Sequence, residues 1–311
     1  MNITDQRILL ELMKNSRTPI TQLAKKVNIS REVATYRINQ LKNKNIIKGF
    51  TAEINTEKLN FMNGSLFLSL KTKGEKELKK FINECNFASW SSEFSGAWTF
   101  GIEIYGKNSY EIDDNFKKIY KQFKEDIIDH RLLIHKTRKQ FYEKFFGEKV
   151  INVKKKIQEK KIDSTDKTIL KELAKDARKG TLALAKTTGL TAPAIAKRIK
   201  KLEQSNYITK YSIFLEPRCI NLLNYSVFIV NKNLDDRTKL LSHLETHPNV
   251  SFLLEYVGDP FIEFGVVIKN PYELRNILQK IEESFPDNRI TEVFLIQSEL
   301  LSLGPPPIVF E

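Results

Sequence analysis

The sequence predicts an α+β protein in which the same pair of domains occurs twice along 311 residues. Three observations lead to this prediction. The chain repeats with a period of about 160 residues, each repeat opens with a basic segment of helical periodicity, and each continues with alternating strand-like and helix-like segments. A chain of this length is expected to form two or more domains of about 100–200 residues each.

The repeat is detected by shifting the sequence against itself. A shift of 161 positions aligns residues 5–50 with residues 166–211 without a gap, and 15 of the 46 aligned pairs are identical. Chance would give about three identities, so the chain contains a duplication. With one extra residue the register continues, and Gly96 aligns with Gly258. The expected parts are helical domains at 1–52 and 163–213, mixed domains at 60–141 and 222–303, a basic linker at 142–162 and a tail at 304–311.

The first domain of each module has the pattern of three helices and a short strand. Thr4 is expected to cap the first helix, and Ser30 and Thr191 are expected to cap the third helix of each copy. Asn28 and Gly189 can take the left-handed conformation needed in the short turn before that helix. The strand that follows is expected to fold back over its own helices. This spacing is typical of a winged helix-turn-helix domain.

The charge is concentrated in these helical domains. Residues 1–50 hold 10 Lys/Arg and 3 Asp/Glu, residues 163–212 hold 11 and 5, and residues 213–311 hold 8 and 14. A polyanion is therefore attracted to the two helical domains and repelled by the last hundred residues. The simplest alternative is a helical hairpin with a solvated basic face.

The outward face of the third helix is the expected contact with double-stranded DNA, because its first residues are placed to touch base edges in the major groove. Arg37 and Arg198, at the border of that face, are expected to hold phosphates. The third helices of the two copies differ in sequence. They are therefore expected to read different DNA half-sites, or one of them contacts only the DNA phosphate backbone. The candidate residues are Ser30, Arg31, Glu32, Thr35, Tyr36, Arg37 and Asn39, and in the second copy Thr191, Ala192, Pro193, Ala196, Lys197, Arg198 and Lys200.

The second domain of each module alternates strands and helices in the order β-α-β-β-α-β, which is the ferredoxin-like arrangement. Two helices cover one face of such a sheet and leave the other face apolar. Phe67, Trp98, Phe228 and Phe264 suggest such a face, and we expect it to pack against the second sheet. The chain would then form an intramolecular pseudo-dimer, with further homo-oligomers possible in principle.

These features resemble the leucine-responsive regulator/AsnC family, also called feast/famine regulators. The resemblance rests on the repeated helical pattern, on Gly189-Leu190-Thr191 and Arg198-Ile199, and on Gly258-Asp259. It implies a transcription regulator that binds DNA, with a ferredoxin-like domain that dimerises and can bind an amino acid.

The effector turn departs from the family pattern. In the family the turn between the second and third strands usually reads Gly-Asp-x-Asp, beside the effector pocket. The second copy keeps Gly258 and Asp259 but has Phe261 in place of the second acid, and the first copy keeps only Gly96. Gly258, Asp259 and Gly96 are the candidate effector residues, with the second copy the better sensor. The alternative is a plain tight turn.

The sequence gives little support to an enzyme, and no cofactor or metal is expected. His243 and His247 are spaced i, i+4, but no third ligand accompanies them, and no Walker loop or dinucleotide fingerprint is present. The apolar stretches are too short to cross a membrane, and two cysteines suit a reducing cytoplasm. Two alternatives stay open. One is an enzyme like sirohaem decarboxylase, a relative built from two similar subunits of this architecture, and the other is an architectural DNA-binding protein without sequence preference.

Overall fold

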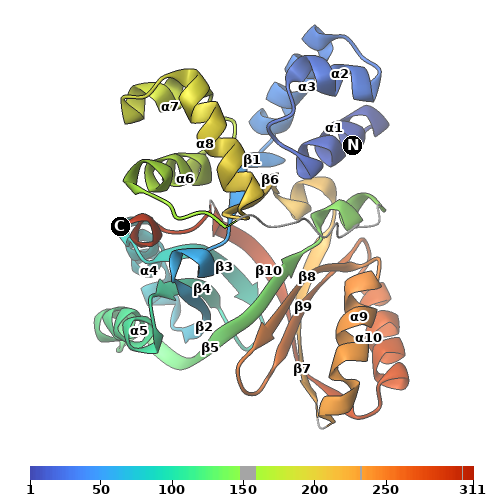
Figure 1. Cartoon of the computed structure of the whole chain (residues 1–311). Helices are drawn as coiled ribbons and strands as arrows, with labels where there is room; N and C mark the ends of the chain where they lie inside the picture. The colour runs from blue at the N-terminus through green and yellow to red at the C-terminus, as the bar shows by residue number, and fades with distance from the viewer. Residues whose placement is uncertain (148–158, 232, 303) are drawn as a thin grey trace.

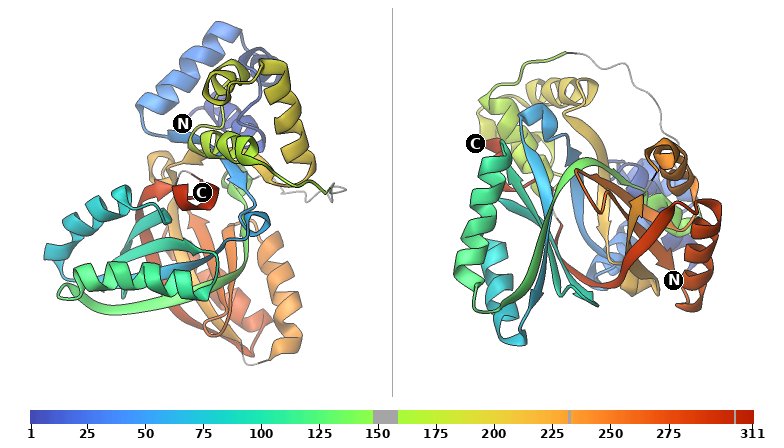
Figure 2. Two further views of the ribbon diagram at one scale, coloured as in Figure 1. Left: turned by 60° about the vertical axis from the view of Figure 1, so that its left-hand side comes forward. Right: turned by 90° about the horizontal axis from the view of Figure 1, so that it is seen from below.

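The computed structural model describes residues 1–147, 159–231, 233–302 and 304–311. Two helical lobes lie on one side of a β-barrel (Figure 1). Seen from below, the helices of the two mixed domains flank the barrel on opposite sides (Figure 2). The predicted α+β fold, with two helix-turn-helix regions each followed by strands and helices, is confirmed. Within the described residues, no helix has both the length and the apolar character required to span a bilayer.

Each helical lobe contains the three predicted helices. Ser30 and Thr191 cap α3 and α8 as predicted, each accepting a hydrogen bond from a backbone N–H three residues on. The predicted cap at Thr4 is wrong, because the Asn2 side chain accepts from the Asp5 N–H and α1 starts earlier. The first lobe comprises α1 (Ile3–Lys14), α2 (Ile20–Val27) and α3 (Arg31–Asn43), and the second comprises α6 (Ser164–Lys175), α7 (Thr181–Thr188) and α8 (Ala192–Gln204).

The strand that follows each lobe is exchanged between the modules. β1 (Ile47–Ile54) pairs antiparallel with β6 (Ile208–Leu215), which gives a two-stranded ribbon below the lobes. β1 contributes Ala52 to the apolar core of the second lobe, and β6 contributes Ile213 to the core of the first. The prediction that each strand folds back over its own helices is confirmed in part, because Ile47 and Ile208 are buried in the cores of their own lobes. Antiparallel pairing then carries each strand on to the other lobe.

The ribbon also marks a pseudo-two-fold axis. Thr51 pairs with Ser212, and these two residues are equivalent in the 161-residue repeat. The same symmetry relates two backbone hydrogen bonds, from Ser16 N–H to the Tyr211 carbonyl and from Ala177 N–H to the Phe50 carbonyl. The two lobes are thus placed as in a dimer, although one chain supplies both.

The mixed domains have the predicted β-α-β-β-α-β order. The last strand of the first domain, β5, is long and continues to Gln140. The first domain contains β2 (Met62–Leu70), α4 (Glu75–Glu84), β3 (Ala88–Ser95), β4 (Phe100–Gly106), α5 (Ser109–Phe123) and β5 (Ile127–Gln140). The second contains β7 (Leu223–Asn231), α9 (Arg237–Thr246), β8 (Val250–Tyr256), β9 (Ile262–Ile268), α10 (Tyr272–Ser284) and β10 (Asn288–Ser302).

The two sheets join edge to edge rather than only stacking. β5 pairs with β8 and β10 pairs with β3, so eight strands close into a barrel in the order β10-β3-β4-β2-β5-β8-β9-β7. Phe67, Trp98 and Phe228 meet inside the barrel, as predicted. Phe264 does not, because it faces the helices α9 and α10 of its own domain. Closure removes free strand edges, which would otherwise pair with other chains.

Short segments after β5 and β10 tie the barrel to the lobes. The 3₁₀ helix Tyr142–Phe146 packs on the first lobe, so the start of the predicted linker is part of a core. The tail, whose role the sequence left open, forms a 3₁₀ helix at Pro307–Phe310 and buries Val309 in the second lobe. Residues 148–158 of the predicted basic linker lie outside the described residues.

Candidate nucleic-acid interface and interdomain cavity

The recognition helix of the first lobe presents polar side chains to solvent. Ala34, Ile38 and Leu41, spaced i, i+4 and i+7, are buried on the side that faces the lobe. On the opposite side Tyr36 is 64% exposed, and Thr35 is half-buried. Arg31, Glu32 and Asn39 are also exposed. This face combines hydrogen-bond donors, acceptors and an aromatic ring, which are the groups that read base edges.

The recognition helix of the second lobe presents a simpler face. Ile195, Ile199 and Leu202 are buried at the same spacing. Lys197 and Lys200 are exposed, and Pro193 and Ala196 beside them carry no hydrogen-bonding side chain. Ala192 is half-buried at the start of α8. The face offers two flexible cations, which suit phosphates better than base edges.

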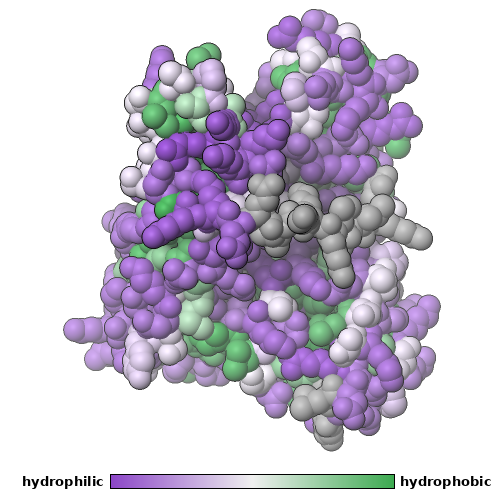
Figure 3. Space-filling view, in the orientation of Figure 1, coloured by the Kyte–Doolittle hydropathy of each residue, from purple (hydrophilic) through white to green (hydrophobic). Residues whose placement is uncertain are grey.

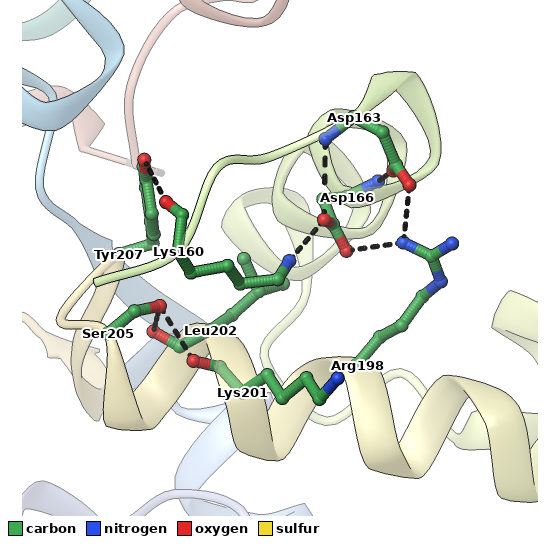
Figure 4. A network of polar contacts seen from close by, with 8 residues as sticks. All are labelled: Lys160, Asp163, Asp166, Arg198, Lys201, Leu202, Ser205 and Tyr207. Atoms are coloured by element: carbon green, nitrogen blue, oxygen red, sulfur yellow. Dashed lines mark hydrogen bonds and ion pairs between the residues drawn. The ribbon is translucent and has the colours of Figure 1, made fainter. Parts of the chain in front are cut away.

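Arg37 and Arg198 have structural partners that the sequence did not reveal. Arg198 Nη1 lies 2.8 Å from Asp163 Oδ2 and 2.9 Å from Asp166 Oδ1 (Figure 4). Arg37 Nη1 contacts Asp5 at 3.0 Å in the equivalent place. Because Asp5 and Asp166 stand in the first turn of α1 and α6, each arginine ties a recognition helix to the first helix of its lobe. The predicted phosphate contact of the two arginines stays a prediction.

Asp166 is the centre of the network in the second lobe. Its carboxylate is almost fully buried, forms a capping box with Asp163 and also pairs with Lys160 (Figure 4). A buried carboxylate is tolerated only when its charge is paired and hydrogen-bonded, and here two cations do so. The network fixes the angle between α6 and α8, and hence the orientation of Lys197 and Lys200.

The lobes form a polar surface on one side of the molecule. Figure 3 shows mostly hydrophilic side chains over both lobes, with a notch between them. The ribbon of β1 and β6 lies below this notch (Figure 1). The structure therefore brings all the predicted DNA-contact residues to the lobes and leaves the barrel on the other side.

The predicted effector residues lie in two exposed turns. Gly258 and Gly96 adopt φ values of 91° and 143°, so both turns need the backbone freedom of glycine. Asp259 is exposed. Each turn borders the other module. Val257, the residue before Gly258, donates its backbone N–H to the Ile134 carbonyl of the first module. A Cβ at Gly96 would lie 3.0 Å from the Cβ of Phe294 in the second module. Their role in effector binding is still a prediction.

A cavity of about 350 Å³ lies elsewhere, between the ribbon and the barrel. Its walls come from β1 and β6 of the ribbon and from β2, β3, β4 and β5 of the first mixed domain. None of the three predicted effector residues lines it. The side chains with chemical interest are Trp90, Glu103, His135, Lys136 and Arg138.

A buried ion pair forms the base of this cavity. Arg138 Nη1 contacts both Glu103 oxygens, at 2.8 and 2.7 Å. Ser89 and Asn63 also donate to Glu103. Burial tends to raise the pKa of Glu103, but the charges of Arg138 and these hydrogen bonds bring it below its usual value. Glu103 is therefore ionised and already saturated with donors.

His135 continues the polar network into the barrel. Its Nε2 lies 2.7 Å from Ser65 Oγ, which accepts from the Tyr256 hydroxyl, and Tyr256 also bonds to Glu263. Burial lowers the pKa of His135 to about 4, so the ring is neutral at pH 7. Its Nδ1 is buried and has no hydrogen-bond partner among the described residues, since Glu103 Oε1 is 3.7 Å away.

The network was not predicted from the sequence. His130, five residues before His135 on the same strand, is exposed and stacks against Phe116, so the two histidines do not form a pair. The available signal was a lone acid in an apolar strand: Glu103 interrupts Phe100–Gly106, and Glu263 interrupts Ile262–Ile268. A carboxylate in a buried strand requires a partner, and that requirement points to a polar site.

Comparisons with known proteins agree with the two-module organisation. A model described as winged helix-turn-helix DNA-binding matches residues 1–48, and one described as the AsnC-type helix-turn-helix domain matches residues 162–203. The transcriptional regulator LrpA of Pyrococcus abyssi is 32% identical over 121 residues, which are 38% of this chain and 83% of LrpA. The regulator FL11 of Pyrococcus horikoshii is 28% identical over 120 residues, which are 39% of this chain and 80% of FL11.

One solved structure is similar over both modules. The sirohaem decarboxylase NirDL superposes with a TM-score of 0.62 at 13% identity, covering 96% of this chain and 93% of that chain. At this identity the likeness shows a shared tandem fold. With the helix-turn-helix regions and the match to LrpA, these findings define a class of protein with two DNA-binding-type lobes on a paired ferredoxin-like body. The chain belongs to the Lrp/AsnC family, with two family modules in one polypeptide.

Proposed function

We propose that the chain is a sequence-specific, DNA-binding transcription regulator in which one polypeptide supplies both DNA-reading lobes. The observation that carries this proposal is the placement of two capped, basic recognition helices on one side of the barrel, related by the pseudo-two-fold axis through Thr51 and Ser212. Two-fold related recognition helices read half-sites about one helical turn of DNA apart, or multiples of it.

The two lobes have different tasks in this proposal. The first lobe reads bases, because Arg31, Tyr36 and Asn39 can form hydrogen bonds or stack at base edges. The second lobe anchors the backbone, because Lys197 and Lys200 are its exposed polar residues facing outward from the middle of α8. The preferred DNA site would then be asymmetric, with one well-specified half.

The test is a selection of bound duplexes from random DNA, with and without a mixture of amino acids. We expect enrichment of a motif with one strong and one weak half. The variant Arg31→Ala/Tyr36→Ala should lose the strong half, whereas Lys197→Ala/Lys200→Ala should keep the motif and weaken binding. Tight binding without enrichment would favour an architectural protein, and absence of binding would contradict the proposal.

A second candidate is an enzyme related to sirohaem decarboxylase. It is favoured by the shared tandem fold with NirDL, which has also been solved with an iron-uroporphyrin III analogue. His135 and Arg138 in the cavity supply the residue types that a carboxylate-rich substrate requires. The cavity of about 350 Å³ is at the low end of ligand pockets, which favours a smaller ligand than a macrocycle of four pyrrole rings.

Absorption spectroscopy separates the two candidates. The purified chain is mixed with iron-uroporphyrin III, and its Soret band is recorded during titration. The regulator proposal predicts an unchanged spectrum. A shifted band that saturates at one equivalent, and is lost in His135→Ala, would favour the enzyme.

A further inference from the structure

Within the described residues, the interdomain cavity is built in one of the two modules, although the fold repeats. The register of the strands identifies the equivalent positions in the two modules. Ser65 pairs with Glu103 in the first module, and the equivalent Ser226 pairs with Gly265 in the second. A bulge follows His135 in β5, and the equivalent bulge follows Ile296 in β10. The second module therefore has Gly265, Ile296 and Glu299 where the first has Glu103, His135 and Arg138.

The equivalent place in the second module is filled. A Cβ at Gly265 would lie 2.3 Å from Ser251 Oγ and from the Phe252 ring. Phe252 thus occupies the space that the Glu103 side chain takes in the first module, where its equivalent Trp90 lines the cavity. A homodimer would carry this site twice, whereas the described part of this chain carries it once.

The side-chain groups in the cavity that can still form hydrogen bonds with a ligand are mainly the N–H donors of cationic residues. Glu103 is saturated, and burial raises the pKa of the nearby Glu53, which favours its neutral form. Arg138 uses only Nη1 for Glu103, and a third of its side chain is exposed. Lys136 is half exposed and has one ion-pair contact, at 3.6 Å to Glu255. Two cations with unused donors fit an anionic group.

The rest of the cavity indicates what surrounds that group. His135 lines the cavity, and its Nδ1 is buried without a hydrogen-bond partner among the described residues, 3.7 Å from Glu103 Oε1. Trp90 offers a flat apolar wall, and Met62 also lines the space. A volume of about 350 Å³ suits a single ring or a short chain.

We infer that this cavity binds one small organic acid per chain, with the carboxylate on Arg138 and Lys136 and the carbon skeleton against Trp90. The ribbon residues Thr51 and Ser212 form part of the same wall, so occupancy is sensed where the two lobes are joined. The regulatory part of this inference rests on the proposed DNA-binding function, and the binding part does not.

The binding test uses isothermal titration of the full chain without DNA. The probes are benzoate and glutarate, each compared with its uncharged amide, benzamide and glutaramide. We expect at least one acid to bind with one site per chain, roughly tenfold or more tighter than its amide, because the charge-assisted hydrogen bonds are lost in the amide.

The variants are chosen to keep the fold intact. Removing Arg138 alone would leave Glu103 buried without its cation, so the test variant is Glu103→Gln/Arg138→Gln, which neutralises both partners. It should weaken acid binding roughly tenfold or more, with its folding checked by circular dichroism. Lys139→Gln, on the same strand but outside the cavity, is the matched control, and Asp259→Asn tests the exposed turn. Neither should change acid binding.

Several results would overturn the inference: no acid binding up to about 10 mM, equal binding of acid and amide, two sites per chain, or unchanged binding by the double variant. DNA affinity is then measured by fluorescence anisotropy with and without the bound acid, and an unchanged affinity would refute the regulatory part. If the acid binds but no DNA does, the proposed function fails and the site stands.

Discussion

Lys197 and Lys200 provide the sharpest test of the DNA interface, because contacts to phosphates have a measurable salt signature. Each neutralised phosphate releases condensed counterions and contributes about 0.9 to the slope of log K against log salt. Both side chains are exposed on α8. If both touch phosphates, Lys197→Ala/Lys200→Ala should lower the magnitude of the slope by about 1.8.

The difference is large enough to measure by fluorescence anisotropy with a labelled duplex. Raising the salt from 50 to 200 mM lowers the binding constant of both proteins. With a slope difference of about 1.8, the fold-loss in binding constant differs between them by roughly tenfold. The wild-type chain should therefore lose about ten times more affinity over this range than the double variant.

A matched control separates local contacts from total charge. Lys239→Ala/Lys280→Ala removes the same two charges from α9 and α10, which lie beside the barrel and outside the lobes (Figure 1). It should leave the slope unchanged within error. An unchanged slope in the Lys197/Lys200 variant, or an equal drop in both variants, would refute the assignment of α8 to the DNA backbone.

Three further predictions follow from other parts of the chain. Arg31→Ala should relax sequence preference at about one base pair, by about 1–3 kcal/mol, with little change in salt slope, as measured by competition with mutated duplexes. Val309→Ala should lower the free energy of unfolding by about 1–3 kcal/mol, because the fully buried side chain fills the second lobe; urea denaturation measures this, and no change would mean the tail is not docked. Burial raises the pKa of Glu263 to about 7, so the folded chain keeps a proton that the unfolded chain loses above about pH 4.5. The free energy of unfolding should therefore fall between about pH 5 and 7, by up to about 3 kcal/mol, and Glu263→Gln should remove this part of the pH dependence.

The local elements could be predicted because they depend on nearby residues. Ser30 and Thr191 are caps whose side chains bond within their own helix, and Asn28 and Gly189 end helices through their own φ angles. These interactions are encoded within a few positions of the sequence. The resemblance to the family added the DNA-binding function, which such interactions alone do not specify.

The exchange of β1 and β6 could not be predicted, because it depends on a choice between equivalent partners. The two strands occupy equivalent positions of the repeat, so the sequence pattern does not specify which lobe each strand packs against. Likewise, residues 136–140 lack apolar alternation and become part of β5 only because β8 pairs with them. The cavity arises from these long-range choices, since its walls come from both the ribbon and the barrel.

Joining two modules in one chain explains why the two halves can differ. In a homodimer every substitution appears twice, so the loss of Glu103 or Arg138 would remove both copies of the cavity. Here Gly265 and Glu299 replace them in one module while the other keeps the site. The covalent link also holds the ribbon strands at high effective concentration, so their pairing does not require a second chain. In the proposed interface, the same freedom lets α3 keep Arg31, Tyr36 and Asn39 on its exposed face, while the exposed face of α8 offers Lys197 and Lys200. A fused pair can therefore assign sensing and base reading to the first module, while the second anchors DNA and completes the barrel.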